Sequence, residues 1–181
     1  MIAASDLIHY LPGLTGIPDA TVRGVYRKLN EAGILPVSRG AKVEKLNTRH
    51  AAMLILGLMV DVPAKDAAAT ARAYYGLTDE NGNKIGDVLA NMLDSFRTVN
   101  NIARLALKSR VEVDCDSPRV CIVSETAEGV IETLFGIRDK PWSDIRIRRS
   151  MTVSGKVLLE LAIGVHFNRW PDATAETTKD I

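Results

Sequence analysis

The sequence contains no segment of the kind that crosses or enters a membrane. No stretch reaches the ~18 unbroken apolar residues that span a bilayer. The first residues, MIAASDLIHYLPGL, have no basic region ahead of an apolar core, as a secretory signal would. We therefore expect a cytoplasmic protein.

The chain also lacks an excess of charge of either sign. Its 23 Lys and Arg residues oppose 22 Asp and Glu residues, so the formal net charge is +1. No global field attracts nucleic acid or an anionic membrane to such a chain, and any site for a polyanion must be local. The 181 residues, 46% of them apolar, suit one domain of ordinary size or two small ones.

Cysteine is scarce. The two cysteines, Cys115 and Cys121, lie on either side of a turn signal at residues 116–119. A two-residue loop would oppose Cys115 with Val120, whereas a three-residue loop would oppose the two cysteines directly. Because thiols in the cytosol are kept reduced, we expect the cysteines to serve packing.

Motifs that indicate catalysis or metal binding are missing. The chain has no GxSxG, GxxxxGK(S/T), GxGxxG, HExxH or CxxC, and His9, His50 and His166 are far apart in the sequence. GLTDENGNKIG resembles the start of a calcium loop, but Lys84 replaces the required glycine and Ala90 the required glutamate. We therefore expect no enzymatic activity, no cofactor and no metal.

What is present begins with a helix from residue 18 to residue 30. Pro18 and Asp19 suit its first turn, and Gly33 stops it. The helix before it ends or bends at Pro12-Gly13. At 100° per residue, one buried stripe of the 18–30 helix consists of Val22, Val25, Tyr26 and Leu29.

The face opposite this stripe is small and basic. Small residues beside arginines let a helix lie deep in a groove while long donors reach base edges. The face is therefore shaped to enter DNA, although the solvated face of an ordinary helix can have the same pattern. It consists of Ala20, Arg23, Gly24 and Arg27, with Thr21 and Lys28 to one side.

A tight turn between two short strands, residues 34–38 and 42–46, predicts a hairpin after the helix. Asn47 or Thr48 can cap a further helix, from residue 49 to about residue 60. Between residues 20 and 50, seven bases oppose Glu31 and Glu44, which leaves a local net charge of +5. The seven bases are Arg23, Arg27, Lys28, Arg39, Lys42, Lys45 and Arg49.

These elements resemble a known DNA-binding unit. TGIPDATVRGVYRKLNEAGIL resembles the second and third helices of a winged helix-turn-helix domain. GILPVSRGAKVEKLNTRHAAML resembles the wing and following helix of the MerR and excisionase-like branch. The chain has Val25-Tyr26 where typical MerR regulators have an aromatic pair, and it has no long coiled-coil hairpin directly after this region. These departures weaken the case for a metal- or drug-sensing role.

The resemblance and the basic face together predict two sets of DNA contacts. Base edges would be contacted from the helix by Ala20, Arg23, Gly24 and Arg27. Phosphates would be contacted from the helix flank, the wing and the next helix by Thr21, Lys28, Arg39, Gly40, Lys42, Lys45 and Arg49.

The middle of the chain predicts helices. Residues 63–76 are alanine-rich between a proline and a glycine, and we expect Tyr74-Tyr75 to pack against the winged domain. Apolar residues recur at helical spacing from residue 87 to residue 108, about six turns or ~33 Å. This helix would pack against a second subunit, giving a homo-oligomer, or lie under the chain's own sheet.

The last third predicts a four-stranded antiparallel sheet with one helix. RVEVDCDSPRVCIVSE forms one hairpin, and TAEGVIETLFG forms the short helix. DIRIRRSMTVSGKVLLELAIGVHF forms a second hairpin around Ser154-Gly155. This register pairs Arg149 with Glu160, Met151 with Leu158 and Ile147 with Ala162.

The predicted fold is α+β. It comprises a winged helix-turn-helix at residues 1–62, a helical connector at 63–109, an α+β domain with two hairpins at 110–169 and a mobile tail at 170–181. We expect sequence-specific binding of double-stranded DNA, as a transcriptional regulator. The alternatives are a phage-type DNA-packaging subunit, similar to a small terminase, and a module that binds protein or ligand without DNA.

Overall fold

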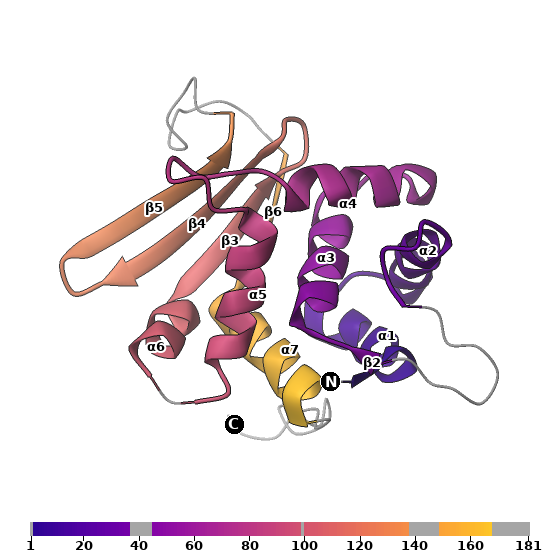
Figure 1. The fold of residues 1–181 in the computed structure, drawn as a ribbon, viewed down its shortest axis with the longest axis horizontal. Helices are drawn as coiled ribbons and strands as arrows, with labels where there is room; N and C mark the ends of the chain where they lie inside the picture. Colours follow the sequence, from indigo (N-terminus) through magenta and orange to yellow (C-terminus); the bar gives the residue numbers. More distant parts are fainter. Residues whose placement is uncertain (1, 37–44, 99, 138–148, 168–181) are drawn as a thin grey trace, which may run out of the picture.

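The computed structural model describes residues 2–36, 45–98, 100–137 and 149–167 and has an α+β fold (Figure 1). The helices are α1 (Ala4–Thr15), α2 (Asp19–Glu31), α3 (Thr48–Met59), the 3-10 helix η1 (Ala64–Asp66), α4 (Ala67–Tyr75), α5 (Ile85–Ser95), α6 (Asn101–Leu107) and α7 (Gly155–Phe167). The strands are β1 (Ile2–Ala3), β2 (Lys45–Leu46), β3 (Ser109–Asp114), β4 (Arg119–Thr126), β5 (Gly129–Gly136) and β6 (Ser150–Ser154).

The four longer strands form one antiparallel sheet in the order β5-β4-β3-β6. Val111 pairs with Ile122 on one side and with Val153 on the other, so the three side chains share one face. The helices cover this face and bury it. Helix α7 packs between the sheet on one side and α1, α3 and α5 on the other. Buried apolar residues form a continuous core from Ile2 to Val165.

The helix predicted to present a basic face is confirmed as α2. Val22, Val25 and Leu29 are buried, as an amphipathic helix at this spacing requires. The preceding helix, α1, does not end at Pro12-Gly13 but continues to Thr15.

The described part of the predicted wing does not form the expected hairpin. Ile34, Leu35 and Pro36 are not in a strand, and Lys45–Leu46 pairs antiparallel with Ile2–Ala3. Strand β2 thus pairs with β1, whereas we expected it to pair with residues 34–38. The rest of the wing, residues 37–44, lies outside the described residues.

The single helix predicted from residue 87 to residue 108 is wrong. Helix α5 ends at Ser95, and the side chain of Asn100 accepts a hydrogen bond from the Ala103 amide to start α6. Asparagine favours such caps over helix interiors because its side chain competes for backbone groups. Apolar spacing alone did not reveal this break.

Two assignments in the last third are also wrong. Residues 129–136 form strand β5, paired with β4, and not a short helix. The β-branched residues Val130, Ile131 and Thr133 favour the strand, and Gly129, with φ 132°, supplies the turn before it.

Residues 155–167 form helix α7 and not the second strand of a hairpin, so the predicted pairs Arg149–Glu160, Met151–Leu158 and Ile147–Ala162 do not exist as strand partners. Strand β6 pairs with β3 instead. The apolar residues here occupy both parities, a pattern that a helix buried on most sides also produces. The predicted four-stranded antiparallel sheet is present, but with β5 in place of residues 155–163.

The β3–β4 hairpin is confirmed with a longer connection than either predicted loop. Val113 pairs with Val120 and Glu112 with Cys121, so Cys115 lies beyond the ladder. Both cysteines are free thiols, as expected.

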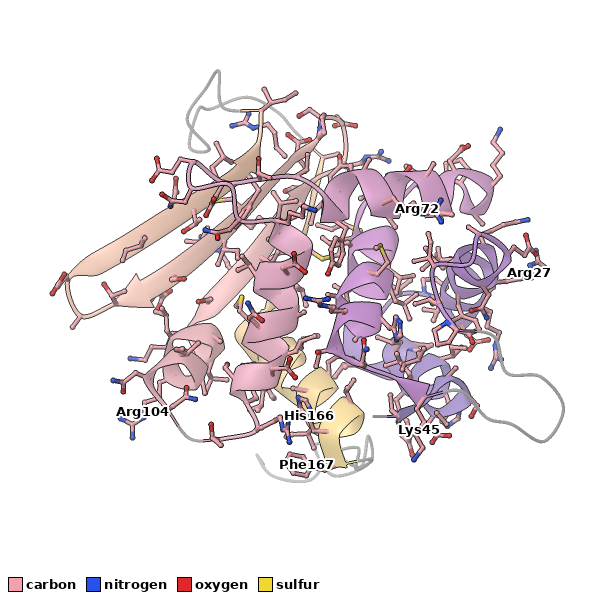
Figure 2. The ribbon with its side chains drawn as sticks, viewed as in Figure 1. Arg27, Lys45, Arg72, Arg104, His166 and Phe167 are labelled. Carbon is pink, nitrogen blue, oxygen red and sulfur yellow. The ribbon has the colours of Figure 1, made fainter. Side chains whose placement is uncertain are left out.

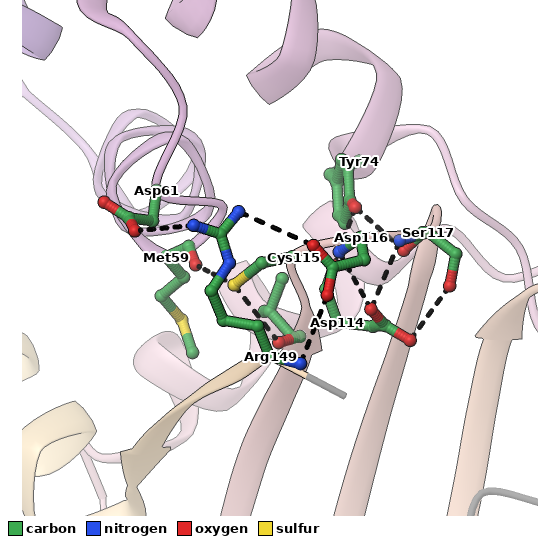
Figure 3. A network of polar contacts seen from close by, with 9 residues as sticks. Met59, Asp61, Tyr74, Asp114, Cys115, Asp116, Ser117 and Arg149 are labelled. Atoms are coloured by element: carbon green, nitrogen blue, oxygen red, sulfur yellow. Dashed lines mark hydrogen bonds and ion pairs between the residues drawn. The ribbon is translucent and has the colours of Figure 1, made fainter. Parts of the chain in front are cut away.

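A polar network joins the end of α3 to the sheet (Figure 3). The Arg149 guanidinium lies 3.3 Å from an Asp61 carboxylate oxygen and 3.6 Å from an Asp116 carboxylate oxygen. Beside it, the Tyr74 hydroxyl lies 2.7 Å from the carbonyl oxygen of Asp114 and 2.8 Å from that of Ser117. Tyr74 is therefore buried as a packing residue, but its hydroxyl bonds to the β3–β4 connection and not to the region predicted as the winged domain. The Arg149 guanidinium is ion-paired within the protein.

Replacing Gly155 with alanine is expected to destabilise the fold strongly. An added Cβ would overlap the carbonyl oxygens of Ala106 and Leu107, which are backbone atoms and cannot move aside cheaply. We expect a loss of ~2 kcal/mol or more in the free energy of unfolding, measured by urea denaturation. The matched control is Gly13→Ala within α1, where a Cβ meets nothing and the change should stabilise by ~0.5–1 kcal/mol. Equal effects of the two changes would contradict this packing.

Candidate nucleic-acid interface

The outer face of α2 is exposed and basic. Ala20, Thr21, Arg23 and Arg27 are all exposed on this helix, while its buried stripe packs on α1 and α3. Arg27 points away from the body of the molecule (Figure 2). The structure therefore brings these four predicted site residues together on one accessible surface.

The three bases of α2 are paired with acids of the same helix. Arg23 Nε lies 2.7 Å from Asp19 Oδ2, and this hydrogen bond raises the pKa of Arg23. Glu31 accepts from Lys28 Nζ at 2.6 Å, which lowers the pKa of Glu31. Arg27 Nε lies 3.6 Å from the other oxygen of Glu31.

These pairs are weak. Their partners are largely exposed, and solvent-exposed pairs one helical turn apart contribute only ~0.3–0.5 kcal/mol each. The arginines are thus held along the helix in the free protein, but a phosphate or a base edge can replace the carboxylates at small cost. Asp19 and Glu31 also reduce the positive field of the face.

Gly24 occupies a different place from the one expected. A Cβ built on Gly24 would lie 3.5 Å from the Ala64 side chain, at ordinary contact distance. Gly24 is therefore part of the packing between α2 and η1, and it leaves no open notch beside the arginines. We omit it from the base-contacting set proposed below.

Lys45 and Arg49 lie on the two elements that follow the wing. Lys45 is exposed on β2, whereas its neighbour Leu46 is buried, as strand alternation requires. Arg49 is exposed in the first turn of α3, and its guanidinium lies 3.7 Å from an Asp87 oxygen. The other predicted wing contacts, Arg39, Gly40 and Lys42, lie outside the described residues.

A reciprocal cap fixes the start of α3 between Lys45 and Arg49. The side-chain oxygen of Asn47 accepts a hydrogen bond from the backbone N–H of His50 at 3.0 Å. Nδ1 of His50 accepts one from the backbone N–H of Asn47 at 3.2 Å. Asn47 was one of the two predicted caps. The capping role of His50 was not predicted, because capping boxes usually have Glu or Gln at this position.

One further base lies near α2 that the sequence did not predict. The Arg72 guanidinium on α4 donates to the Ala32 carbonyl oxygen at 2.8 Å, at the carboxyl end of α2 (Figure 2). A positive charge is favourable at this end of a helix. No local signal identifies this residue, since its position depends on how α4 packs against α2.

A polar cleft of about 620 Å³ lies where α3, α5 and α7 meet. Within it, Asp94 accepts from the Thr48 hydroxyl at 3.1 Å and lies 3.4 Å from His166 Nε2. Burial lowers the pKa of His166, which favours its neutral form. The Thr48 hydroxyl bonds to the carboxylate and not to the imidazole, so the trio does not have the hydroxyl–imidazole–carboxylate order of a hydrolase triad.

The other groups that titrate unusually point to packing. Burial raises the pKa of the Cys115 thiol, which disfavours the reactive thiolate. No group of three or more metal-ligating side chains occurs among the described residues. The described helices include none that is both long and apolar enough to span a bilayer.

The chain matches no protein-family model, no curated protein and no solved structure in the comparisons made. A function for α2, β2 and α3 has to be inferred from their geometry and charge.

Acid is expected to weaken the cap of α3. Nδ1 of His50 accepts a hydrogen bond only when it is unprotonated, and burial lowers the pKa of His50 below 6.5. Because the unfolded chain then binds the proton more tightly, the stabilisation is complete above pH 6.5 and is lost as pH falls through the folded pKa.

The variant His50→Gln tests this, because glutamine can make the same bond without titrating. Urea unfolding at pH 7.5 and pH 5 should show a smaller loss of stability on acidification in the variant than in the native chain. An unchanged loss would assign the acid sensitivity to other groups, of which His166 is one.

Proposed function

We propose that the protein binds double-stranded DNA sequence-specifically and acts in transcription regulation. The observation that carries the proposal is the outer face of α2: Arg23 and Arg27 stand exposed beside Ala20 and Thr21, on a helix whose opposite side is locked into the core. A rigid helix with small residues and arginines on its open side fits the major groove.

The neighbouring elements support a helix-turn-helix arrangement. A three-residue connection, Gly16-Ile17-Pro18, joins α1 to α2, and Gly16 adopts φ 72°, a turn conformation that glycine tolerates. Helices α1 and α3 both pack against α2. In the proposed complex α2 enters the groove, and the remainder of the helical part lies outside it.

The proposed contacts fall into two kinds. Arg23 and Arg27 exchange their carboxylate partners for guanine edges, where an arginine can bond O6 and N7 together. Thr21, Lys28, Lys45 and Arg49 contact phosphates, which position the protein without reading the sequence. Arg39, Gly40 and Lys42 stay predicted phosphate contacts of the wing.

Arg27→Ala is expected to relax base preference, whereas Lys45→Ala should weaken binding to all duplexes alike. Loss of a bidentate base contact costs ~1–3 kcal/mol on the preferred duplex, and loss of a phosphate contact lowers the salt slope by about one unit. Selection from random duplexes identifies the preferred sequence, and binding at two salt concentrations gives the slope. The control is Lys84→Ala in the exposed turn before α5, which should change neither quantity.

Two outcomes would contradict the proposal. If the native chain retained no duplex at low salt, the basic face of α2 would only be solvated. If it retained all duplexes equally, and both variants lost affinity equally on all of them, binding would be architectural and not sequence-specific.

Removing the acid that holds Arg27 and Lys28 should strengthen DNA binding. In Glu31→Gln the two bases lose a carboxylate partner, and the repulsion between that carboxylate and phosphate disappears. We expect a several-fold rise in affinity at low salt, measured by fluorescence anisotropy, and a change below ~0.5 kcal/mol in stability. Glu80→Gln, an equal change of charge in an exposed turn, is the control. Equal effects of the two variants would mean that α2 does not face the DNA.

A further inference from the structure

Exposed apolar side chains gather at one end of the molecule. In the described part of the chain, eight large apolar side chains are exposed, and five of these belong to α6 and β5. They include Ile102 at 63% and Val130 at 64% exposure, values that leave most of each side chain in water. The five are Ile102, Leu105, Leu107, Val130 and Ile131.

The two elements are joined into one surface. The Ser109 hydroxyl donates to the Leu105 carbonyl oxygen at 2.7 Å and lies 2.8 Å from the Ser124 hydroxyl. Ser124 pairs with Ile131 across β4 and β5, so Ile131 emerges on the side of the sheet that carries α6. Figure 1 shows α6 and the turn between β4 and β5 at the same end of the molecule.

Opposite charges flank this apolar surface. The exposed bases Arg104 and Lys108 belong to α6 and its cap, and the exposed acid Glu128 belongs to the tip of the β4–β5 hairpin. Val130 and Glu132 alternate with Ile131 and emerge on the other side of the sheet. Among the described residues Arg104, Lys108 and Glu128 form no ion pair. Strand β5 is also the last in the sheet order, with no described strand on its outer side.

We infer that this surface, formed by α6 and the β4–β5 hairpin, binds a second copy of the same chain about a twofold axis. A twofold contact needs a surface that is complementary to itself. Here Ile102 and Leu105 of one copy can cover Ile131 of the other, which places the bases of each α6 opposite Glu128 at the tip of the other hairpin. The oligomer contact expected along residues 87–108 is thus assigned to α6 and the hairpin instead.

This dimer has a consequence for DNA that rests on the proposed function. The surface lies at the opposite end of the molecule from α2 (Figure 1). The two α2 helices would therefore stand at the outer ends of the dimer. Such a dimer suits half-sites on separate duplexes, or half-sites spaced by more than the single helical turn that closely placed recognition helices require.

Sedimentation of the full chain over a range of concentrations, without DNA, tests the dimer. The native chain should sediment as a species of twice 19.7 kDa. Ile102→Asp should raise the dimer dissociation constant about 30-fold, as loss of a central apolar contact does. Because Ile102 is exposed, its replacement should leave the unfolding midpoint of the monomer nearly unchanged.

Charge reversal identifies the partner surface. Arg104→Glu and Glu128→Arg should each weaken the dimer, and the two changes in one chain should restore it, because both twofold-related contacts then regain opposite charges. Arg27→Glu on α2 is the control and should not alter sedimentation. A monomeric native chain, or a dimer that none of these changes at α6 and the hairpin tip affects, would overturn the inference. Neither result depends on whether α2 binds DNA.

Discussion

Helix α7 packs between the other helices and the sheet. This helix packs against α1, α3 and α5 on one side and against β3 and β6 on the other, and it buries Leu158, Leu161 and Val165. Its first residue, Gly155, lies against the backbone at the end of α6 with no room for a side chain. Burial of α7 therefore joins the helical part of the chain to the sheet in one core.

Helix α2 is held in place indirectly, through the helices that contact α7. Its apolar stripe packs on α1 and α3, which in turn contact α7, and its opposite face is left to solvent. The ion pairs within α2 hold the arginines along the helix only weakly, since exposed pairs contribute little. The buried side of α2 is rigid, and the bases on its exposed side can exchange partners at a small cost in free energy.

The two surfaces proposed for partners differ in their chemistry and lie apart. The face of α2 is basic and contains only small apolar groups, which suits a hydrated, charged groove. The surface of α6 and the β4–β5 hairpin is apolar at its centre and mixed in charge around it, which suits a protein. The polar network of Arg149, Asp61 and Asp116 links the end of α3 to the sheet and belongs to neither surface.

Elements with local signals were predictable from the sequence. The stripe of α2, the cap at Asn47 and the β3–β4 hairpin follow from periodicity, capping and alternation, and all three are present. Tertiary structure decided the rest, because an apolar run satisfies a strand and a buried helix equally well until its neighbours are known. Residues 155–167 became a helix because the core surrounds them, Lys45–Leu46 pairs with Ile2–Ala3 because the chain returns there, and Gly24 lies against Ala64 because η1 packs on α2.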